Sequence, residues 1–131
     1  MTDAPATPAL RVTPLTVLPE IGPTLRRYLA LGFEPVATDD PGCVGLRAGT
    51  TAVILASAAF MAGDFAAAHV SSLAGRTITY VHVASVDEVT ARLPTTTRIV
   101  QDVRTRGGTR EVLVEDSGDH LILAETTTEA G

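Results

Sequence analysis

A β-hairpin predicted near the end of the sequence is the feature that most constrains the fold. The residues from Val112 to Val114 form a short apolar run, and a second apolar run covers residues 121–123. Residues 116–119, between the two runs, are Asp, Ser, Gly and Asp, and these residue types favour turns. The sequence therefore predicts two strands joined by a tight turn, which close the domain.

The composition predicts one domain that does not bind nucleic acid. The chain has 131 residues, and 45% of them are hydrophobic, which is enough for one core of ordinary size. It has no lysine, its ten arginines are scattered, and its formal net charge is −5. Such a chain offers no basic stripe that would follow a phosphate backbone, so nucleic acid is not expected as a partner.

Cysteine content and hydropathy give expectations about the compartment. The single Cys43 excludes an internal disulfide and any zinc site built from several cysteines, and it fits a reducing compartment. The first ten residues lack the positive charge and the apolar run of a secretory signal. No apolar run approaches the roughly twenty residues that a membrane-spanning helix needs. We expect a cytoplasmic protein with no membrane partner.

Hydrophobic periodicity predicts two similar halves within one domain. Residues 1–10 and 126–131 have the composition of flexible tails, so the domain is expected to cover 11–125. The first half, about 11–57, is predicted to contain a strand, a helix and three strands, at 12–18, 20–31, 34–38, 44–47 and 51–56. An Ala-rich connection over 58–75 is expected to form one or two short helical turns. The second half, about 76–125, repeats the βαβββ order, at 77–84, 86–93, 98–104, 110–115 and 120–125.

Two local signals refine this prediction. Pro14 has no N–H to donate, so it predicts an edge position or a bulge in the first strand. Ser85 and Glu88 have the spacing of a capping box, in which the hydroxyl accepts from a backbone N–H and the carboxylate reaches back. The second helix is therefore expected to begin directly after Ser85.

Two sequence stretches also resemble a known superfamily. The closing stretch has Gly108-Thr109-Arg110-Glu111, a strand, the Asp-Ser-Gly turn and a short apolar strand. In the first half, residues 28–33 (Tyr-Leu-Ala-Leu-Gly-Phe) are similar to the signature that ends the first helix of that superfamily. Over residues 11–125 the chain resembles the vicinal oxygen chelate superfamily of glyoxalases, extradiol dioxygenases and bleomycin-resistance proteins. The resemblance implies an α+β fold in which two βαβββ modules form a curved, mixed β-sheet cup.

The resemblance also implies where a divalent metal ion would bind. Metal enzymes of the superfamily use a His or Glu near the start of the first strand of each half, and a Glu on the last strand. Here these positions match Thr13, Ile78 (or Thr79) and Leu123. Because a divalent ion needs several carboxylate or imidazole ligands, we expect no metal cofactor. As an alternative, a different register would bring together His82, His120 and Glu125 as a metal site.

Alternation along the strand at 77–84 predicts which side chains line the cup. Tyr80 and His82 share one face with Ile78, whereas the other face carries Thr79, Val81 and Val83 and suits packing against the helices. We expect the ligand to contact Tyr80, His82, Gln101, Arg110 and Leu123, and we assign no catalytic residue. Alternatively, Tyr80 and His82 fill the cup or lie at a dimer interface, and Arg110 pairs with Glu111 or Asp102.

These observations favour a metal-free protein that sequesters or senses a small organic molecule in the cup of a homodimer. An apolar wall with a few polar groups is typical of such sites. An alternative function is an enzyme of glyoxalase, isomerase or dioxygenase type, with a metal site in another register or with Tyr80 or His82 as acid or base. A third alternative is a fold that serves only dimerisation or contact with a partner.

Overall fold

A computed structural model describes residues 9–36, 40–105 and 108–125 of the chain. Of the tails expected at 1–10 and 126–131, residues 1–8 and 126–131 lie outside the described residues, as does the predicted strand end at 37–38. The expected tail is wrong for Ala9 and Leu10, which begin the first strand. The described residues form two compact units. We call residues 13–79 the N-terminal unit, and we call residues 9–12 together with 80–125 the C-terminal unit. The first strand of the chain and the fifth each contribute residues to both units.

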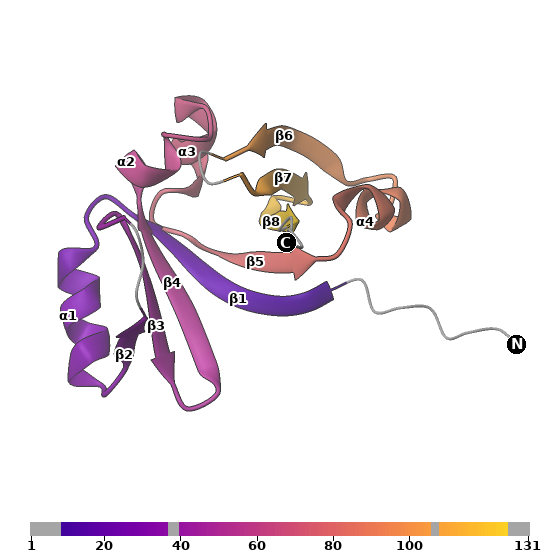
Figure 1. Cartoon of the computed structure of the whole chain (residues 1–131). Helices are drawn as coiled ribbons and strands as arrows, with labels where there is room; N and C mark the ends of the chain where they lie inside the picture. The colour runs from indigo at the N-terminus through magenta and orange to yellow at the C-terminus, as the bar shows by residue number, and fades with distance from the viewer. Residues whose placement is uncertain (1–8, 37–39, 106–107, 126–131) are drawn as a thin grey trace, which may run out of the picture. The chain divides into compact units, whose positions relative to one another are not determined.

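The described elements follow the predicted βαβββ order in each half (Figure 1). In the first half they are β1 (Ala9–Leu18), α1 (Gly22–Ala30), β2 (Glu34–Val36), β3 (Cys43–Ala48) and β4 (Thr51–Ser57). The connection contains two short helices, α2 (Ala58–Met61) and α3 (Ala67–Leu73). The second half contains β5 (Thr77–Val83), α4 (Val86–Arg92), β6 (Arg98–Arg104), β7 (Arg110–Asp116) and β8 (Asp119–Glu125).

Strand pairing repeats the same topology in both halves. Hydrogen bonds join the strands in the order β2-β3-β4-β1-β5-β8-β7-β6, so the first strand of each half lies beside the last strand of that half. β1 pairs with β4 in parallel, with Leu15 opposite Ile54, whereas the β2–β3, β3–β4, β6–β7 and β7–β8 pairs are antiparallel. The predicted α+β fold with two βαβββ modules and a mixed sheet is confirmed.

The edge position considered for Pro14 is wrong, because β1 lies between β4 and β5. The pairing of β1 with β4 runs from Leu15 to Leu18 and begins directly after the proline. Pro14 therefore lies where its missing N–H removes no bond from this ladder.

The predicted closing hairpin is present in the C-terminal unit. Asp116 pairs with Asp119 at its end, and the two residues between them, Ser117 and Gly118, have φ values of 56° and 81°. Positive φ at both central residues is typical of the type I′ turn, whose twist matches that of the flanking strands. Glycine adopts this conformation without strain, whereas Ser117 adopts it at some cost.

In the N-terminal unit, the buried apolar side chains come mainly from the strands and the connection helices. Fully buried side chains come from β1, β3, β4 and α3, namely Val17, Leu46, Leu55 and Leu73. α2 and the segment after it add Met61 and Phe65, and the hydroxyl of Ser57 caps α2 by accepting from Phe60 N at 3.0 Å. By contrast, α1 has no buried residue. No helix among the described residues is long and apolar enough to cross a membrane.

Truncation of Leu46 to alanine is predicted to lower the free energy of unfolding by about 2–5 kcal/mol, because Leu46 is fully buried and a cavity would remain. The matched control is Leu31→Ala in the same unit, where the side chain is 73% exposed and the expected loss is below about 0.5 kcal/mol. Urea unfolding of both variants measures the difference. Equal losses would contradict the assignment of Leu46 to the core.

Candidate functional site

The two faces of the sheet in the C-terminal unit differ in chemistry. One face packs against α4 and forms a core cluster of Val83, Val86, Val112, Val114 and Leu123. Val81 and Leu121 on the strands, and Val89 and Leu93 from α4 and its end, pack against this cluster. These contacts confirm the predicted division of β5, in which Val81 and Val83 pack against a helix and Tyr80 and His82 belong to the other face.

The opposite face carries a group of polar side chains. The hydroxyl of Tyr80 donates a hydrogen bond to Oε2 of Glu111 on β7, so both side chains lie on this face. The ring of His82 packs edge-on to the ring of Tyr80, with centroids 5.1 Å apart and planes at 64°. We call Tyr80, His82 and Glu111, together with Arg11 of β1, the polar cluster. Tyr80, His82 and Glu111 are half-buried, whereas Arg11 is exposed.

Arg11 places a positive charge beside His82. Its Nη2 lies 3.4 Å from Nδ1 and 3.3 Å from Nε2 of His82. Partial burial of the imidazole lowers its pKa below the ordinary value of 6.5, and the positive charge of Arg11 lowers it further. At neutral pH the imidazole is therefore uncharged, with one nitrogen that donates and one that accepts.

Two buried apolar residues lie on the same face as the polar cluster. Leu113 lies two residues from Glu111 along β7, and directly opposite it are Gln101 on β6 and Ile122 on β8. Residues opposite each other in a ladder share a face, so Gln101 and Ile122 belong to this face. Leu113 and Ile122 are fully buried, and Gln101 is half-buried. The structure thus places Gln101 on the same face as Tyr80 and His82.

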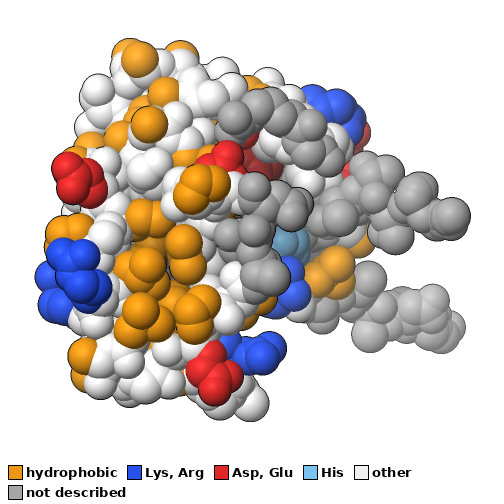
Figure 2. Space-filling view, turned by 60° about the vertical axis from the view of Figure 1, so that its left-hand side comes forward, with side chains coloured by type: hydrophobic (Ala, Val, Ile, Leu, Met, Phe, Trp, Pro, Cys, Tyr) orange, Lys and Arg blue, Asp and Glu red, His pale blue; other side chains and the backbone are white. Residues whose placement is uncertain are grey.

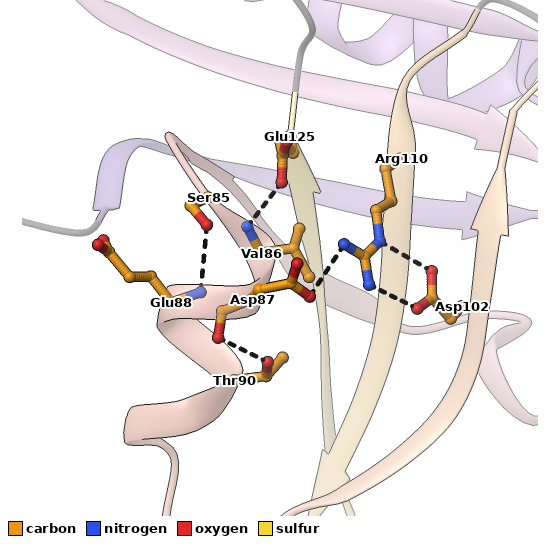
Figure 3. A network of polar contacts seen from close by, with 8 residues as sticks. All are labelled: Ser85, Val86, Asp87, Glu88, Thr90, Asp102, Arg110 and Glu125. Atoms are coloured by element: carbon orange, nitrogen blue, oxygen red, sulfur yellow. Dashed lines mark hydrogen bonds and ion pairs between the residues drawn. The ribbon is translucent and has the colours of Figure 1, made fainter.

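Arg110 and Leu123 lie on the other face, so the structure does not bring them together with Tyr80 and His82. Leu123 is 3% exposed within the core cluster against α4. Figure 3 shows Arg110 between β6 and α4, where it donates to both oxygens of Asp102, at 2.8 and 3.2 Å, and to Asp87 at 3.1 Å. Hydrogen bonding to Asp102, followed by that to Asp87, raises the pKa of Arg110. The structure therefore shows the ion pair with Asp102 that was considered as the alternative for Arg110.

Glu125 caps α4. Its Oε1 accepts a hydrogen bond from the backbone N–H of Val86 at 2.8 Å, and the hydroxyl of Ser85 accepts from the N–H of Glu88 at 3.2 Å (Figure 3). The predicted Ser85 cap is thus confirmed. Two of the N–H groups that a helix leaves unpaired at its start are satisfied in this way.

The alternative metal site at His82, His120 and Glu125 is wrong. In β8, His120 is opposite Glu115, whereas Glu125 is opposite Arg110. His120 and Glu125 are an odd number of positions apart along the strand, so their side chains point to opposite faces. Among the residues that the structure describes, no three His, Cys, Asp or Glu side chains are grouped so that they would hold a metal ion.

The positions that the resemblance assigned to metal ligands do not fit a divalent ion either. Thr13 and Ile78 are each 5% exposed, and Leu123 is part of the α4 core. One hydroxyl and two hydrocarbon side chains supply no carboxylate or imidazole. The residues present therefore do not provide the ligand set of the superfamily's metal enzymes.

Sequence reasoning did not identify Arg11 and Glu111 as site residues. Glu111 was considered only as a partner of Arg110, although strand alternation separates these neighbours onto opposite faces. Alternation along residues 111–115 puts Glu111 on the face opposite Val112, but its approach to Tyr80 depends on the sheet topology. Arg11 lies 71 residues from His82, and no local pattern indicates that pair.

Comparisons with known proteins show the fold. No family model matches the chain, and no curated protein matches it. A glyoxalase/bleomycin resistance protein/dioxygenase superfamily member from Vibrio splendidus 12B01 has 14% identity and a TM-score of 0.58, over 88% of this chain and 98% of that chain. A hypothetical protein from Bacillus halodurans C-125 has 14% identity and a TM-score of 0.62, over 92% and 97%. Methylmalonyl-CoA epimerase from Mycobacterium tuberculosis has 13% identity and a TM-score of 0.61, over 97% and 95%. The chain therefore has the fold of the glyoxalase/bleomycin resistance protein/dioxygenase superfamily, as the sequence resemblance implied.

NMR titration of His82 is predicted to give a pKa below 6.5. Substitution Arg11→Gln is expected to raise that pKa only part of the way, because burial is the larger cause. Because the pKa of His82 is lower in the folded than in the unfolded chain, the unfolded chain binds more protons below about pH 6.5. The free energy of unfolding therefore decreases as the pH falls below that value. Arg92→Gln on α4 is the control and should leave the His82 titration unchanged. An unaltered titration in Arg11→Gln would contradict the contact.

Substitution Asp102→Asn is predicted to lower the free energy of unfolding at pH 7 by no more than about 1 kcal/mol, because the side chain is 44% exposed. The hydrogen bond from Arg110 lowers the pKa of Asp102 below 3.8. The ion pair between Asp102 and Arg110 therefore stabilises the folded state above about pH 3.8. This stabilisation is lost as the pH falls through the lowered pKa of Asp102. Urea unfolding at pH 7 and at about pH 2 checks this, with Glu20→Gln as the control. A difference that persists at the lower pH would refute the ion-pair explanation.

Proposed function

We propose that this chain binds a small organic molecule, without a metal ion, on the sheet face that carries the polar cluster. The observation that supports this proposal is the contrast between the two faces of the C-terminal unit. One face is closed by α4, whereas the other carries Tyr80, His82 and Glu111 together with the buried Leu113 and Ile122. A few convergent polar groups in an apolar surrounding are typical of small-molecule sites.

An orphaned polar atom on the same face supports the proposal. His120 lies opposite Glu115, which shares its face of β7 with Glu111. Its Nδ1 is buried and has no hydrogen-bond partner in the described part of the chain. A buried polar atom without a partner costs roughly 1–3 kcal/mol, and a bound polar group would remove that cost.

The chemistry of the polar cluster indicates the kind of ligand. Glu111 offers a carboxylate, Arg11 a guanidinium, and His82 an uncharged imidazole at neutral pH. A ligand that both donates and accepts hydrogen bonds suits these groups better than a pure hydrocarbon. With only 4% aromatic residues and no tryptophan in the chain, we expect a small or aliphatic ligand in preference to a large planar one.

The metal-free part of the proposal rests on donor chemistry. Thr13, Ile78 and Leu123 stand where the superfamily's metal ligands were expected, and Leu123 is packed against α4. The homodimer and the cytoplasmic location expected from the sequence stay predictions. Sequestering or sensing of the ligand is the role we assign, since the proposal includes no reaction.

An enzyme that uses acid–base chemistry is a second candidate, favoured by the hydrogen bond from Tyr80 to Glu111. In such a pair the carboxylate is the base and the phenol the acid, with His82 as the neighbouring proton carrier. Elemental analysis of the purified protein separates a metal enzyme from both candidates. Stoichiometric zinc, iron, nickel or manganese would overturn the metal-free proposal.

A fragment library of small polar molecules is predicted to contain ligands that shift the NMR amide signals of Tyr80, His82 and Glu111. Tyr80→Phe is expected to weaken such a ligand about threefold to tenfold, the effect of one hydrogen bond. The matched control is Asp87→Asn on α4, which belongs to the opposite face and should leave the affinity unchanged. The proposal would be contradicted if the fragments shifted only α4 signals, or if Asp87→Asn lowered the affinity as much as Tyr80→Phe.

A further inference from the structure

A hollow of about 590 Å³ lies beside α1 within the N-terminal unit. On the α1 side its lining residues have helical spacing, because Arg27 and Tyr28 are each three or four positions from both Thr24 and Leu31. The remaining lining residues come from the end of α1, from β1 and from β5, namely Ala30, Thr16, Leu18 and Thr77. In Figure 2 the side of the molecule that carries α1 in Figure 1 is turned toward the viewer, and hydrophobic side chains gather on it.

The packing of α1 is unusual for an amphipathic helix. In a globular protein the apolar side of such a helix normally packs on a core. Here none of its residues is buried, and Tyr28 is only half-buried beside the hollow. Leu31, at the end of the helix, is 73% exposed. The helix therefore borders an open apolar space that a ligand of matching shape would fill.

Charge distinguishes this hollow from a purely apolar groove. Arg27 lines it, and among the described residues its Nη2 donates one long hydrogen bond, 3.4 Å to the hydroxyl of Thr24. Within the part of the chain that the structure describes, no carboxylate pairs with Arg27, and no acidic residue lines the hollow. On the opposite wall, the hydroxyls of Thr16 and Thr77 lie 2.7 Å apart and satisfy each other.

We propose that this hollow binds a small amphipathic monocarboxylate. The carboxylate accepts hydrogen bonds from the guanidinium of Arg27, whose planar fork matches a carboxylate. The hydrocarbon chain lies against Leu18, Tyr28 and Leu31 and removes their apolar surface from water. The volume lies within the range of about 300–1,000 Å³ that is typical of small-molecule sites. The hollow shares no residue with the polar cluster, so this proposal stands independently of the proposed function.

Straight-chain carboxylates test the proposal on the full chain. Butanoate, hexanoate and octanoate are titrated while NMR amide signals and heat of binding are recorded, with octanol as the uncharged control for octanoate. We expect shifts in residues 24–31, and a dissociation constant that falls by up to about fourfold for each added methylene, as expected for burial of a hydrocarbon chain. We expect octanol to bind at least about tenfold more weakly than octanoate, because it lacks the charge.

Two arginines on one helix provide a matched pair of variants. Arg27→Gln is expected to weaken octanoate about tenfold or more, the loss of one charge-assisted contact. Arg26→Gln, in an exposed neighbour that does not line the hollow, should change it less than about twofold. Tyr80→Phe should also leave octanoate binding unchanged, which separates this test from that of the polar cluster. The proposal would be overturned if octanol bound as tightly as octanoate, or if both arginine variants lost the same affinity for octanoate. It would also be overturned if no carboxylate shifted the signals of residues 24–31.

Discussion

Apolar contact between α4 and the sheet assigns the two faces of the C-terminal unit. Val86 of α4 is fully buried against Val112 and Leu123, and this seam orients β7 and β8. Because side chains alternate along a strand, fixing Val112 on the helix side places Glu111 and Leu113 on the other side. The polar cluster on that side is therefore a consequence of the hydrophobic seam, and its geometry depends on residues that never touch it.

Local signals were enough to predict the elements, but not the faces of every strand. On β5, polar and apolar residues alternate, and the sequence alone separated Tyr80 and His82 from Val81 and Val83. On β8, Ile122, Leu123 and Ala124 are apolar in succession and all are buried. A strand buried on both faces carries no period of two, so sequence reasoning had no basis for placing Leu123 beside the polar residues or against the helix.

The contacts that the sequence did not indicate are long-range pairs of polar side chains. The Arg11–His82 pair and the Tyr80–Glu111 pair depend on which strands become neighbours in the sheet, which is set by topology. Arg110, by contrast, has partners in the adjacent strand and in the helix before it, and the ion pair with Asp102 was considered as one of its alternatives. The loose packing of α1 was likewise hidden, because its apolar spacing is the same as that of a tightly packed helix.

The cap that Glu125 supplies to α4 joins two segments 39 residues apart in the chain. Ser85 is next to the helix and is available as soon as the helix forms, whereas Glu125 is the last described residue of the last strand. The first turn of α4 thus acquires the hydrogen bond at the N–H of Val86 only once β8 has paired with the sheet. Pairing of β8 therefore adds to the stability of α4, although the strand and the helix are far apart in the sequence.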